Sequence, residues 1–295
     1  MFVSKVSRHV QMKIRNVINQ SELKKLREWK IKINKAKKNK LVHPFQYYSP
    51  FVEIDDVNSI SRRHLFYCKT QKRCIHLLSD GEARGYHCLL HQEDVIGIRE
   101  QFPLHLPETI RIANEMGVLH PRNWKTKEVY VMSTDFLVDR VNFETGTIFQ
   151  EARNYKYWDQ IYEYSENGLV VKKRWRTWQK AAIEEIFWAS KSIPTIQMTD
   201  RDATKIAAQN ITWFRMRQEL DVDENDLSAF KSAFSNSYLS NTRVWLEEHL
   251  FNASKMMGLS VKDVQAMFQF AAYHHEIDLN IELPIRLAEP LVVYV

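Results

Sequence analysis

The stretch Val129-Tyr-Val-Met-Ser-Thr-Asp-Phe-Leu-Val-Asp-Arg-Val-Asn-Phe-Glu-Thr-Gly-Thr-Ile-Phe-Gln-Glu-Ala-Arg153 decides the fold expected for this chain. It predicts two β-strands joined by a turn over Asn142–Gly146, because runs rich in apolar residues flank residues that favour turns. Asp135 stands in the otherwise apolar first strand, and Glu151 and Arg153 stand in the second. We therefore predict a β-hairpin that carries acidic and basic side chains.

Mirroring the hairpin about residue 143 places Asp135 nearly opposite Glu151. Adjacent carboxylates repel each other unless a cation lies between them, and clustered carboxylates hold Mg²⁺ in enzymes that hydrolyse phosphodiesters. Glu151 and Arg153 are two residues apart and share one face of the strand. The pattern predicts a catalytic site that uses Mg²⁺ or Mn²⁺. The alternative is an exposed strand face with a Glu151–Arg153 ion pair.

Glu82 is a candidate third metal ligand, delivered from a helix. The segment Ser79-Asp-Gly-Glu82 matches the capping box Ser-x-x-Glu and predicts a helix that extends to about Gln92. The alternative is that Glu82 only caps this helix.

Length and composition indicate a globular protein. The 295 residues are 44% hydrophobic, enough for one large or two modest cores. Neither a membrane-spanning apolar run nor a secretory signal is evident, so we expect a soluble cytoplasmic protein with no membrane partner. The three cysteines, Cys68, Cys74 and Cys88, are too few for a disulfide framework and fit a reducing compartment.

Positive charge is concentrated at the N-terminus. Residues 1–40 contain 13 Lys or Arg against Glu22 and Glu28, whereas the whole chain has a net charge of +6. A cationic segment on a mildly acidic body favours a polyanion such as DNA, because phosphate neutralisation releases counterions. The alternative is a solvated basic tail.

The order of predicted elements indicates an α/β fold with three parts. We expect a basic helical arm and linker over 1–45, a nuclease-sized domain over 46–220 and an α+β domain over 221–295. Strands are expected near 51–54, 64–67, 72–78, 95–100 and 193–198, and helices near 79–92, 106–116 and 178–190. Three C-terminal helices, near 224–235, 240–257 and 260–274, precede a strand pair at 277–287 and 291–295, the outline of a winged helix.

Three motifs in order resemble a known family. They are His76-Leu-Leu-Ser-Asp-Gly-Glu82, Asp94-Val-Ile-Gly-Ile-Arg-Glu-Gln-Phe-Pro-Leu104 and Val131-Met-Ser-Thr-Asp-Phe-Leu-Val-Asp139. They resemble the TnsA endonuclease subunit of heteromeric, Tn-type transposases, over roughly residues 50–215. The resemblance implies a restriction-endonuclease-like mixed sheet flanked by helices, followed by a winged-helix-like C-terminal domain that contacts the transposition machinery.

The resemblance also implies an activity and partners. A protein of this family nicks DNA at the 5′ ends of a transposon, in the bacterial cytoplasm at the nucleoid, beside an integrase-type transposase subunit and an AAA+ regulator. The family's metal site implies Glu82 and Asp135 as ligands. Counting along the hairpin without a gap assigns Glu151 to the family's Gln/Glu position and Arg153 to its lysine.

The arginine departs from the family pattern. Arginine stays protonated and presents a planar fork, so Arg153 suits a phosphate better than it suits a general base. Lys156, Lys172 or Lys173 could supply the amine instead, although Lys156 is expected on the strand face opposite Arg153. Two alternatives to an active transposase subunit remain open: a catalytically degenerate subunit that binds and bridges DNA, and a free-standing restriction-like nuclease.

Two other groups of residues have ordinary structural explanations. Six potential zinc ligands fall between Cys68 and His91, but their spacing matches no zinc module, so packed cysteines and histidines are expected. The segment Lys172-Lys-Arg-Trp-Arg176 predicts a solvated face, although alternating basic and aromatic residues also suit phosphate contacts.

Overall fold

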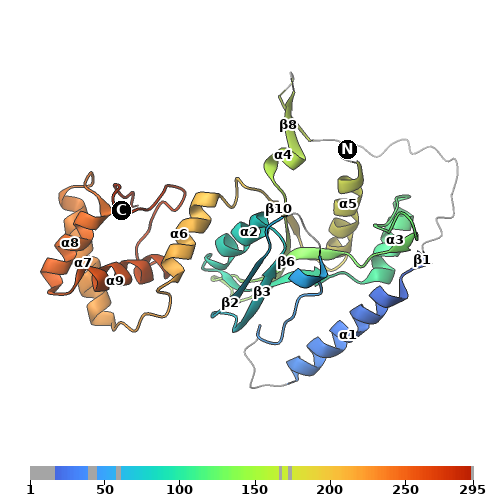
Figure 1. The fold of residues 1–295 in the computed structure, drawn as a ribbon, viewed down its shortest axis with the longest axis horizontal. Helices are drawn as coiled ribbons and strands as arrows, with labels where there is room; N and C mark the ends of the chain where they lie inside the picture. The colour runs from blue at the N-terminus through green and yellow to red at the C-terminus, as the bar shows by residue number, and fades with distance from the viewer. Residues whose placement is uncertain (1–16, 39–44, 58–60, 166–167, 172–174, 294–295) are drawn as a thin grey trace. The chain divides into compact units, whose positions relative to one another are not determined.

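The computed structural model shows an α/β architecture (Figure 1). It describes residues 17–38, 45–57, 61–165, 168–171 and 175–293. The basic residues before position 17, and Lys172 and Lys173, therefore lie outside the described residues.

A four-stranded sheet forms the centre of the first part of the chain. Its strands are β4 (Val95–Pro103), β6 (Ser133–Val141), β7 (Ile148–Tyr155) and β10 (Thr195–Met198), in the order β10-β7-β6-β4. β6 pairs antiparallel with both β4 and β7, so the predicted hairpin lies at the centre of the sheet. Phe136, Leu137 and Val138 of β6 are buried, which places the apolar middle of this strand in the core of the sheet domain.

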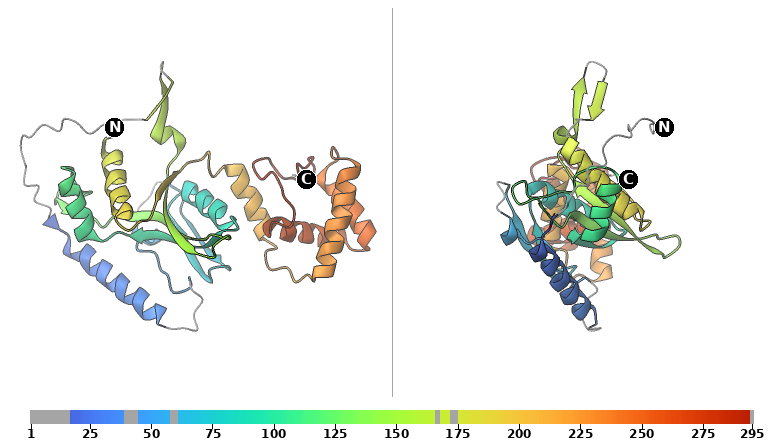
Figure 2. Two further views of the ribbon diagram at one scale, coloured as in Figure 1. Left: turned by 180° about the vertical axis from the view of Figure 1, so that it is seen from behind. Right: turned by 90° about the vertical axis from the view of Figure 1, so that its right-hand side faces the viewer.

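Helices α3 (Leu106–Glu115) and α5 (Trp175–Ala189) pack beside each other and against the sheet (Figure 2). Leu137 of β6 and Ala152 of β7 are buried in one cluster with residues of both helices. α3 begins with Pro107 in its first turn, where a proline costs no hydrogen bond, and ends before Gly117, whose φ is +68°.

A second hairpin lies next to β4. It consists of β2 (His64–Cys68) and β3 (Arg73–Leu77), and α2 (Asp80–Leu90) follows it after two residues. Arg73 donates from both terminal nitrogens to Glu100 of β4, at 2.7 and 2.5 Å, and both side chains are buried. The strand predicted at 51–54 is wrong: only a short 3₁₀ turn, η1 (Ile54–Asp56), forms there.

The basic N-terminal helix is a packed element of this first part. α1 (Gln20–Lys37) buries Leu26 and Ile33, and the Trp29 indole donates to the Ser49 carbonyl at 2.6 Å. The short strands β1 (Val17–Ile18) and β5 (Glu128–Val129) pair in parallel beside it. The described part of the predicted arm is therefore attached to the sheet domain rather than separate from it.

A narrow hairpin projects from the sheet domain in every view (Figures 1 and 2). Its strands are β8 (Tyr162–Ser165) and β9 (Gly168–Val171), and the single turn α4 (Trp158–Ile161) connects it to the end of β7.

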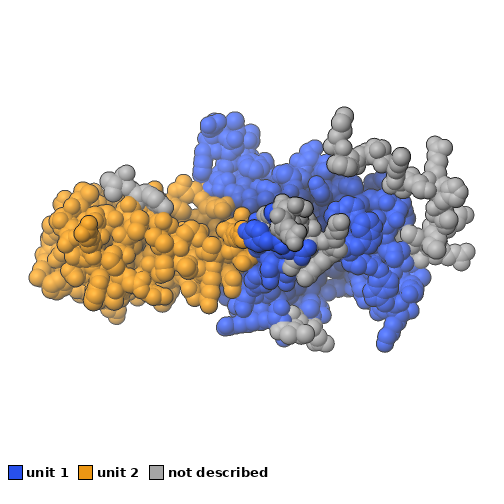
Figure 3. Space-filling view, turned by 90° about the horizontal axis from the view of Figure 1, so that it is seen from above, with its two compact units in different colours: residues 1–82, 94–197 blue, residues 83–93, 198–295 orange. Residues whose placement is uncertain are grey.

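The chain divides into two compact units (Figure 3). The first contains residues 1–82 and 94–197, and the second contains 83–93 and 198–295. The division therefore precedes the boundary expected at 221. The physical reason is that α6 (Lys205–Arg215) contributes Phe214 to the second unit's core.

The second unit is helical in its described residues. α7 (Glu224–Ser240), α8 (Leu246–Met257) and α9 (Val261–Tyr273) surround a core that contains Phe230, Phe234 and Phe268. The strand pair predicted after them is wrong up to residue 293, because only isolated bridges such as Leu279–Val293 form. Over the described residues, no helix is both long and apolar enough to cross a membrane.

Candidate functional site

The register of the β6–β7 hairpin differs from the predicted one. Glu151 lies opposite Val138, so the predicted pairing of Glu151 with Asp135 is wrong. Val138 and Asp135 are three residues apart along β6, which corresponds to about 10 Å of strand. Glu151 is therefore displaced from Asp135 by about a third of the length of β6, which has 9 residues.

The turn causes this difference. Val141 pairs with Ile148, so the strands are mirrored about a point between Glu144 and Thr145 rather than about residue 143. The Asn142 side chain accepts from the backbone N–H groups of Glu144 and Thr145, at 2.9 and 3.0 Å, and Gly146 has a φ of +66°. An Asx turn followed by a left-handed glycine makes a longer connection than a tight hairpin turn.

Glu151 belongs to a buried ion-pair network. Its carboxylate accepts from Arg140 Nε and, at 2.8 Å, from Arg153 Nε. Arg140 also binds both carboxylate oxygens of Asp94, each at 2.7 Å. The Glu151 side chain is 6% exposed, so the Glu151–Arg153 pair that the alternative interpretation anticipated is buried rather than solvated. Two arginines compensate its charge, as a buried carboxylate requires.

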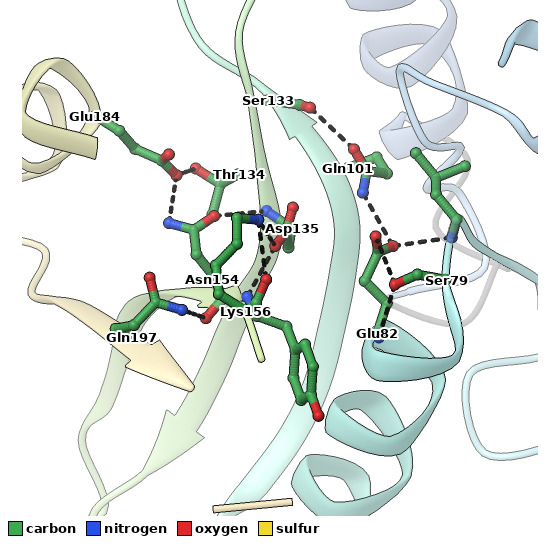
Figure 4. Close-up of polar contacts among 12 residues, drawn as sticks. Ser79, Glu82, Gln101, Ser133, Thr134, Asp135, Asn154, Lys156, Glu184 and Gln197 are labelled. Atoms are coloured by element: carbon green, nitrogen blue, oxygen red, sulfur yellow. Dashed lines mark hydrogen bonds and ion pairs between the residues drawn. The ribbon is translucent and has the colours of Figure 1, made fainter. Parts of the chain in front are cut away.

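Asp135 is joined to the C-terminal end of β7 (Figure 4). Its backbone N–H donates to the Asn154 side-chain oxygen at 3.2 Å, and its carboxylate accepts the Tyr155 backbone N–H at 2.8 Å. Lys156 Nζ lies 3.9 Å from Asp135 Oδ2. The backbone pairing of β6 and β7 ends at Phe136 and Arg153. Beyond that pair, hydrogen bonds that involve the Asp135 and Asn154 side chains link the two strands, and they hold the Asp135 carboxylate beside a lysine.

Asn154 and Lys156 therefore lie beside Asp135, in the places where a gapless count along the hairpin predicts Glu151 and Arg153. Asn154-Tyr-Lys156 has the same one-residue gap as the Glu-x-Lys pattern of restriction-like nucleases. The signal was present in the sequence, but counting without a gap selected the residues three positions earlier.

Glu82 lies in the first turn of α2 and caps it. The Glu82 backbone N–H donates to Ser79 Oγ at 3.1 Å, while the Glu82 carboxylate accepts from the Leu78 backbone N–H at 2.9 Å and from Ser79 Oγ at 3.3 Å. The predicted helix start is confirmed, and the carboxylate returns to the chain just before it.

The negative charge of Asp135 also acts on the Glu82 carboxylate. Burial, followed by the negative charge of Asp135, raises the pKa of Glu82 to about 7, although the Leu78 N–H, the Gln101 amide and the positive charge of Lys156 act in the opposite direction. α2, β6 and the end of β7 therefore place Glu82, Asp135 and Lys156 close enough for their charges to interact. A cation between the carboxylates would relieve their repulsion.

A strained residue positions Glu82. Gln101, in β4, has a φ of +48°, which is uncommon for a side chain other than glycine. Its amide nitrogen donates to Glu82 Oε2 at 3.2 Å, and its amide oxygen accepts from Ser133 Oγ at 2.9 Å. Such backbone strain costs on the order of 1–3 kcal/mol and concentrates at functional sites.

The side-chain alternation of β6 is interrupted next to Asp135. Leu137 clusters with Trp188 of α5, yet Thr134, three residues earlier, also accepts the Trp188 indole N–H at 2.7 Å. A regular strand would direct Thr134 and Leu137 to opposite faces. This break accompanies the strained Gln101 on the neighbouring strand, and it explains why strict alternation is a poor guide to where Asp135 points.

Glu184 of α5 accepts hydrogen bonds from two residues next to Asp135. Thr134 Oγ1 and Asn154 Nδ2 donate to Glu184 Oε1 at 2.5 and 2.9 Å. Burial raises the pKa of Glu184. The Asn154 amide nitrogen is thereby directed to α5, which leaves its oxygen directed to Asp135.

Glu82 and Asp135 are the residues of this site that could hold a divalent metal ion. Mg²⁺ prefers oxygen ligands, keeps several waters and is commonly bound through one or two carboxylates together with substrate phosphate. Glu82 and Asp135 supply two carboxylates, and Asn154 supplies an amide oxygen. Within the described ranges no group of three His, Cys, Asp or Glu side chains could hold a metal ion, so any ion here would need water or phosphate as further ligands.

The cysteine–histidine segment contains free thiols. Cys68 is buried, Cys74 is exposed and Cys88 is half-buried. His91 stacks on His275, with 4.3 Å between ring centroids, and burial together with the neighbouring histidines lowers its pKa to about 4.

Comparisons with known proteins define the class of the domain that carries this site. Residues 92–200 match the family described as TnsA-like endonuclease N terminal. The matched range contains Asp135, Asn154 and Lys156, whereas Glu82 precedes it. Residues 92–200 are therefore similar to a TnsA-like endonuclease domain, and the resemblance seen in the sequence motifs is confirmed.

One curated relative extends this match. Over 166 residues the chain is 33% identical to the Transposon Tn7 transposition protein TnsA of Escherichia coli, and the match covers 56% of this chain and 55% of that protein. The chain thus spans about half the length of the curated relative that it matches.

Proposed function

We propose that this protein is a transposon endonuclease subunit that makes 5′-end nicks by metal-dependent hydrolysis of DNA phosphodiesters. The observation that carries the proposal is the convergence of Glu82 with Asp135 and Lys156, the latter two within the range that matches a TnsA-like endonuclease. Its partners are DNA, an integrase-type transposase subunit and an AAA+ regulator, as the similarity to a Tn7 transposition protein suggests. The second unit, which is helical in its described residues, is proposed as the part that contacts them.

Each residue of the site has a role in this proposal. Glu82 and Asp135 hold Mg²⁺, or Mn²⁺ in its place, with Asn154 as an amide ligand or as the residue that orients Asp135. The ion, when bound, polarises the scissile phosphate and lowers the pKa of an attacking water. Lys156 places a compact positive charge beside Asp135, where it can neutralise the developing phosphate charge or exchange a proton with water.

This assignment replaces Glu151 and Arg153. Arg140 and Arg153 already donate to the Glu151 carboxylate, and Glu151 lies opposite Val138. We propose that Glu151 and Arg153 stabilise the hairpin rather than contact metal or DNA, so that the arginine at the apparent lysine position is no defect in the site.

A nicking assay with matched variants tests the proposal. The substrate is supercoiled plasmid carrying transposon ends, with Mg²⁺ or Mn²⁺, in the presence of the partner subunits. We expect Asp135→Ala and Lys156→Ala each to lower the nicking rate at least about a hundredfold, because they remove a ligand and a transition-state cation. Arg153→Ala, compared at equal folded fraction, is expected to retain most activity. Nicking that depends on Arg153 and not on Lys156 would restore the gapless assignment.

Metal binding separates an active subunit from a degenerate one. Two carboxylates are a small ligand set, which is the observation that favours a DNA-bridging subunit without catalysis. Titration of Mn²⁺ should show one site that Glu82→Gln and Asp135→Asn both weaken. If wild-type protein neither binds Mn²⁺ nor nicks DNA with its partners present, yet still joins the assembly, the bridging function replaces the catalytic one.

A further inference from the structure

Exposed tryptophans and basic side chains form a contiguous surface on the sheet domain. We call it the aromatic–basic surface and define it by Trp124, Trp175, Trp178, Arg122, Lys127 and Arg176. The three tryptophans are 56%, 64% and 52% exposed. Large apolar side chains gathered on a surface mark interaction sites more often than scattered ones do.

The surface is organised by ring contacts. Trp175 and Trp178 lie three residues apart at the start of α5 and stack, with ring centroids 5.2 Å apart and 21° between their planes. The Arg176 guanidinium lies over the Trp124 ring at 3.9 Å, and Lys127 Nζ lies 5.7 Å from the same ring. Cation–π contacts of this kind hold both partners in place without neutralising the cation.

The positive charge of the surface is concentrated. Arg122 Nε donates to the His120 carbonyl at 3.3 Å, which fixes the guanidinium on this surface. Burial and the charge of Arg176 lower the pKa of Arg122. Two neighbouring guanidiniums repel each other less when a phosphate lies between them, and arginine binds phosphate through a planar fork.

One helix links the surface to the candidate active site. α5 carries Trp175 and Trp178 near its start, and its Glu184 accepts from the Asn154 side chain beside Asp135. Trp178 and Trp175 are six and nine residues before Glu184, which corresponds to about 9 and 14 Å along the helix. A strand advances by at least about 3.4 Å per nucleotide, the value for stacked B-form DNA, so this distance corresponds to at most about four nucleotides.

We propose that the aromatic–basic surface binds single-stranded DNA a few nucleotides from the phosphodiester that is cut. Unpaired bases stack on Trp175 and Trp178, and the strand's phosphates contact Arg122 and Arg176. A single strand fits better than a duplex, because the faces of paired bases are hidden within the stack whereas an exposed tryptophan offers a platform to an unpaired base. The position of the surface rests on the proposed function, but binding to it needs neither metal nor cleavage.

Binding is measured with the full-length protein in EDTA, which prevents cleavage. The probes are a fluorescein-labelled 20-nucleotide oligothymidine and a duplex of equal length, followed by fluorescence anisotropy at several salt concentrations. Trp175→Ala/Trp178→Ala should weaken oligothymidine binding at least about tenfold, because stacking contributes about 1–3 kcal/mol per base. Arg176→Glu should reduce the slope of log K against log salt by about 1.

Conservative and remote variants serve as controls. Trp175→Phe/Trp178→Phe keeps two aromatic faces and should retain most of the affinity. Phe251→Ala removes an exposed ring of α8 that also lies under a cation, Lys255, and should leave oligothymidine binding unchanged. Circular dichroism checks that each variant is folded.

Three outcomes overturn the proposal. Wild-type affinity of the folded double-alanine variant would show that DNA does not bind here and would leave a protein as the partner of the surface. Equal losses for oligothymidine and duplex, or a loss for duplex alone, would make it a duplex contact. Asp135→Ala should bind oligothymidine like wild type, so a failure to nick DNA and a failure of this surface are distinguished.

Discussion

The sequence presents Glu82 either as a helix cap or as a metal ligand, and the structure allows one side chain to do both. Its carboxylate accepts from the Leu78 backbone and the Ser79 hydroxyl, so it is a helix cap. The Gln101 amide donates to it as well, so three of about four lone-pair sites are used and one is left for a metal or a water. Capping also immobilises the side chain before any ligand binds, which favours a defined site.

His120 makes the stability of the sheet domain depend on pH. It is fully buried between the Pro121 carbonyl and the Thr109 hydroxyl, and burial lowers its pKa to about 4. The unfolded chain binds this proton below about pH 6.5 whereas the folded chain does not, so stability is full above that pH and is lost as the pH falls towards 4. From pH 7 to pH 5 we expect a loss of about 2 kcal/mol from this residue.

The effect is measured as the difference between wild type and His120→Gln in urea unfolding at pH 5, 6 and 7, with hydrogen exchange of β6 reporting the sheet domain. The glutamine keeps a donor and an acceptor but does not titrate in this range, so its stability should fall less on acidification. Parallel pH curves for the two proteins would show that His120 titrates normally.

At the scale of elements, the close packing of the start of α2 against the end of β7 requires that Gly81 has no side chain. A Cβ atom at Gly81 would lie 2.2 Å from Tyr155 Cε1, well inside contact distance. Tyr155 is buried, its N–H holds the Asp135 carboxylate, and Lys156 follows it. The two elements that carry Glu82 and Lys156 can approach each other because this position is glycine.

Gly81→Ala is therefore expected to lower the nicking rate at least about tenfold and to lower the thermal midpoint, although alanine favours a helix over glycine by up to about 1 kcal/mol. The reason is that the Tyr155 ring and the strand end must move. Gly81→Ala combined with Tyr155→Val restores space and should recover part of the activity, measured in the same assay. A raised midpoint with unchanged nicking would mean that the ring moves aside without cost.

The elements of the sheet domain could largely be predicted from sequence, but the register could not. Apolar runs and turn residues identified β6, β7 and α3, and the capping box identified α2. The residue of β7 that lies opposite Asp135 depends on which residues form the turn. Asn142 and Gly146 mark that turn, but the φ of Gly146 and the Asx hydrogen bonds set its length, and a shift of 1.5 residues in the centre moves the pairing by three.

Contacts between distant segments were also beyond sequence reasoning. The strained Gln101 and the break in β6 arise from packing of several elements, and no local pattern signals them. Alternation predicts that Lys156 and Arg153 lie on opposite faces of the strand, but it does not predict that the lysine lies beside Asp135.

At the scale of the whole molecule, α6 decides where the second unit begins. Phe214 is fully buried with Phe230, Phe234 and Phe268, so the helix belongs to the same core as α7 and α9. We expect Phe214→Ala to destabilise this unit by about 3–5 kcal/mol, because it leaves a cavity in an aromatic core. Hydrogen exchange should accelerate in residues 224–240 and 261–273, while β6 and β7 keep their protection.

Phe251→Ala is the matched control, since that ring lies on α8 of the same unit and is 48% exposed. It should change stability by no more than about 0.5 kcal/mol. Faster exchange in β6 and β7 after Phe214→Ala, with α7 and α9 unaffected, would assign α6 to the sheet domain and support the boundary at 221.

The turn of the β6–β7 hairpin, exposed over residues 142–149, lies at the end of the strands remote from Asp135 and Lys156. Doubling the length of a loop adds only about 0.6 kcal/mol of closure cost. Residues inserted between Glu144 and Thr145 would thus lengthen the interval between the acid and the lysine without moving either. A fixed-length motif search is unreliable across such a tip, and a short epitope tag placed there should leave the nicking rate and thermal midpoint unchanged.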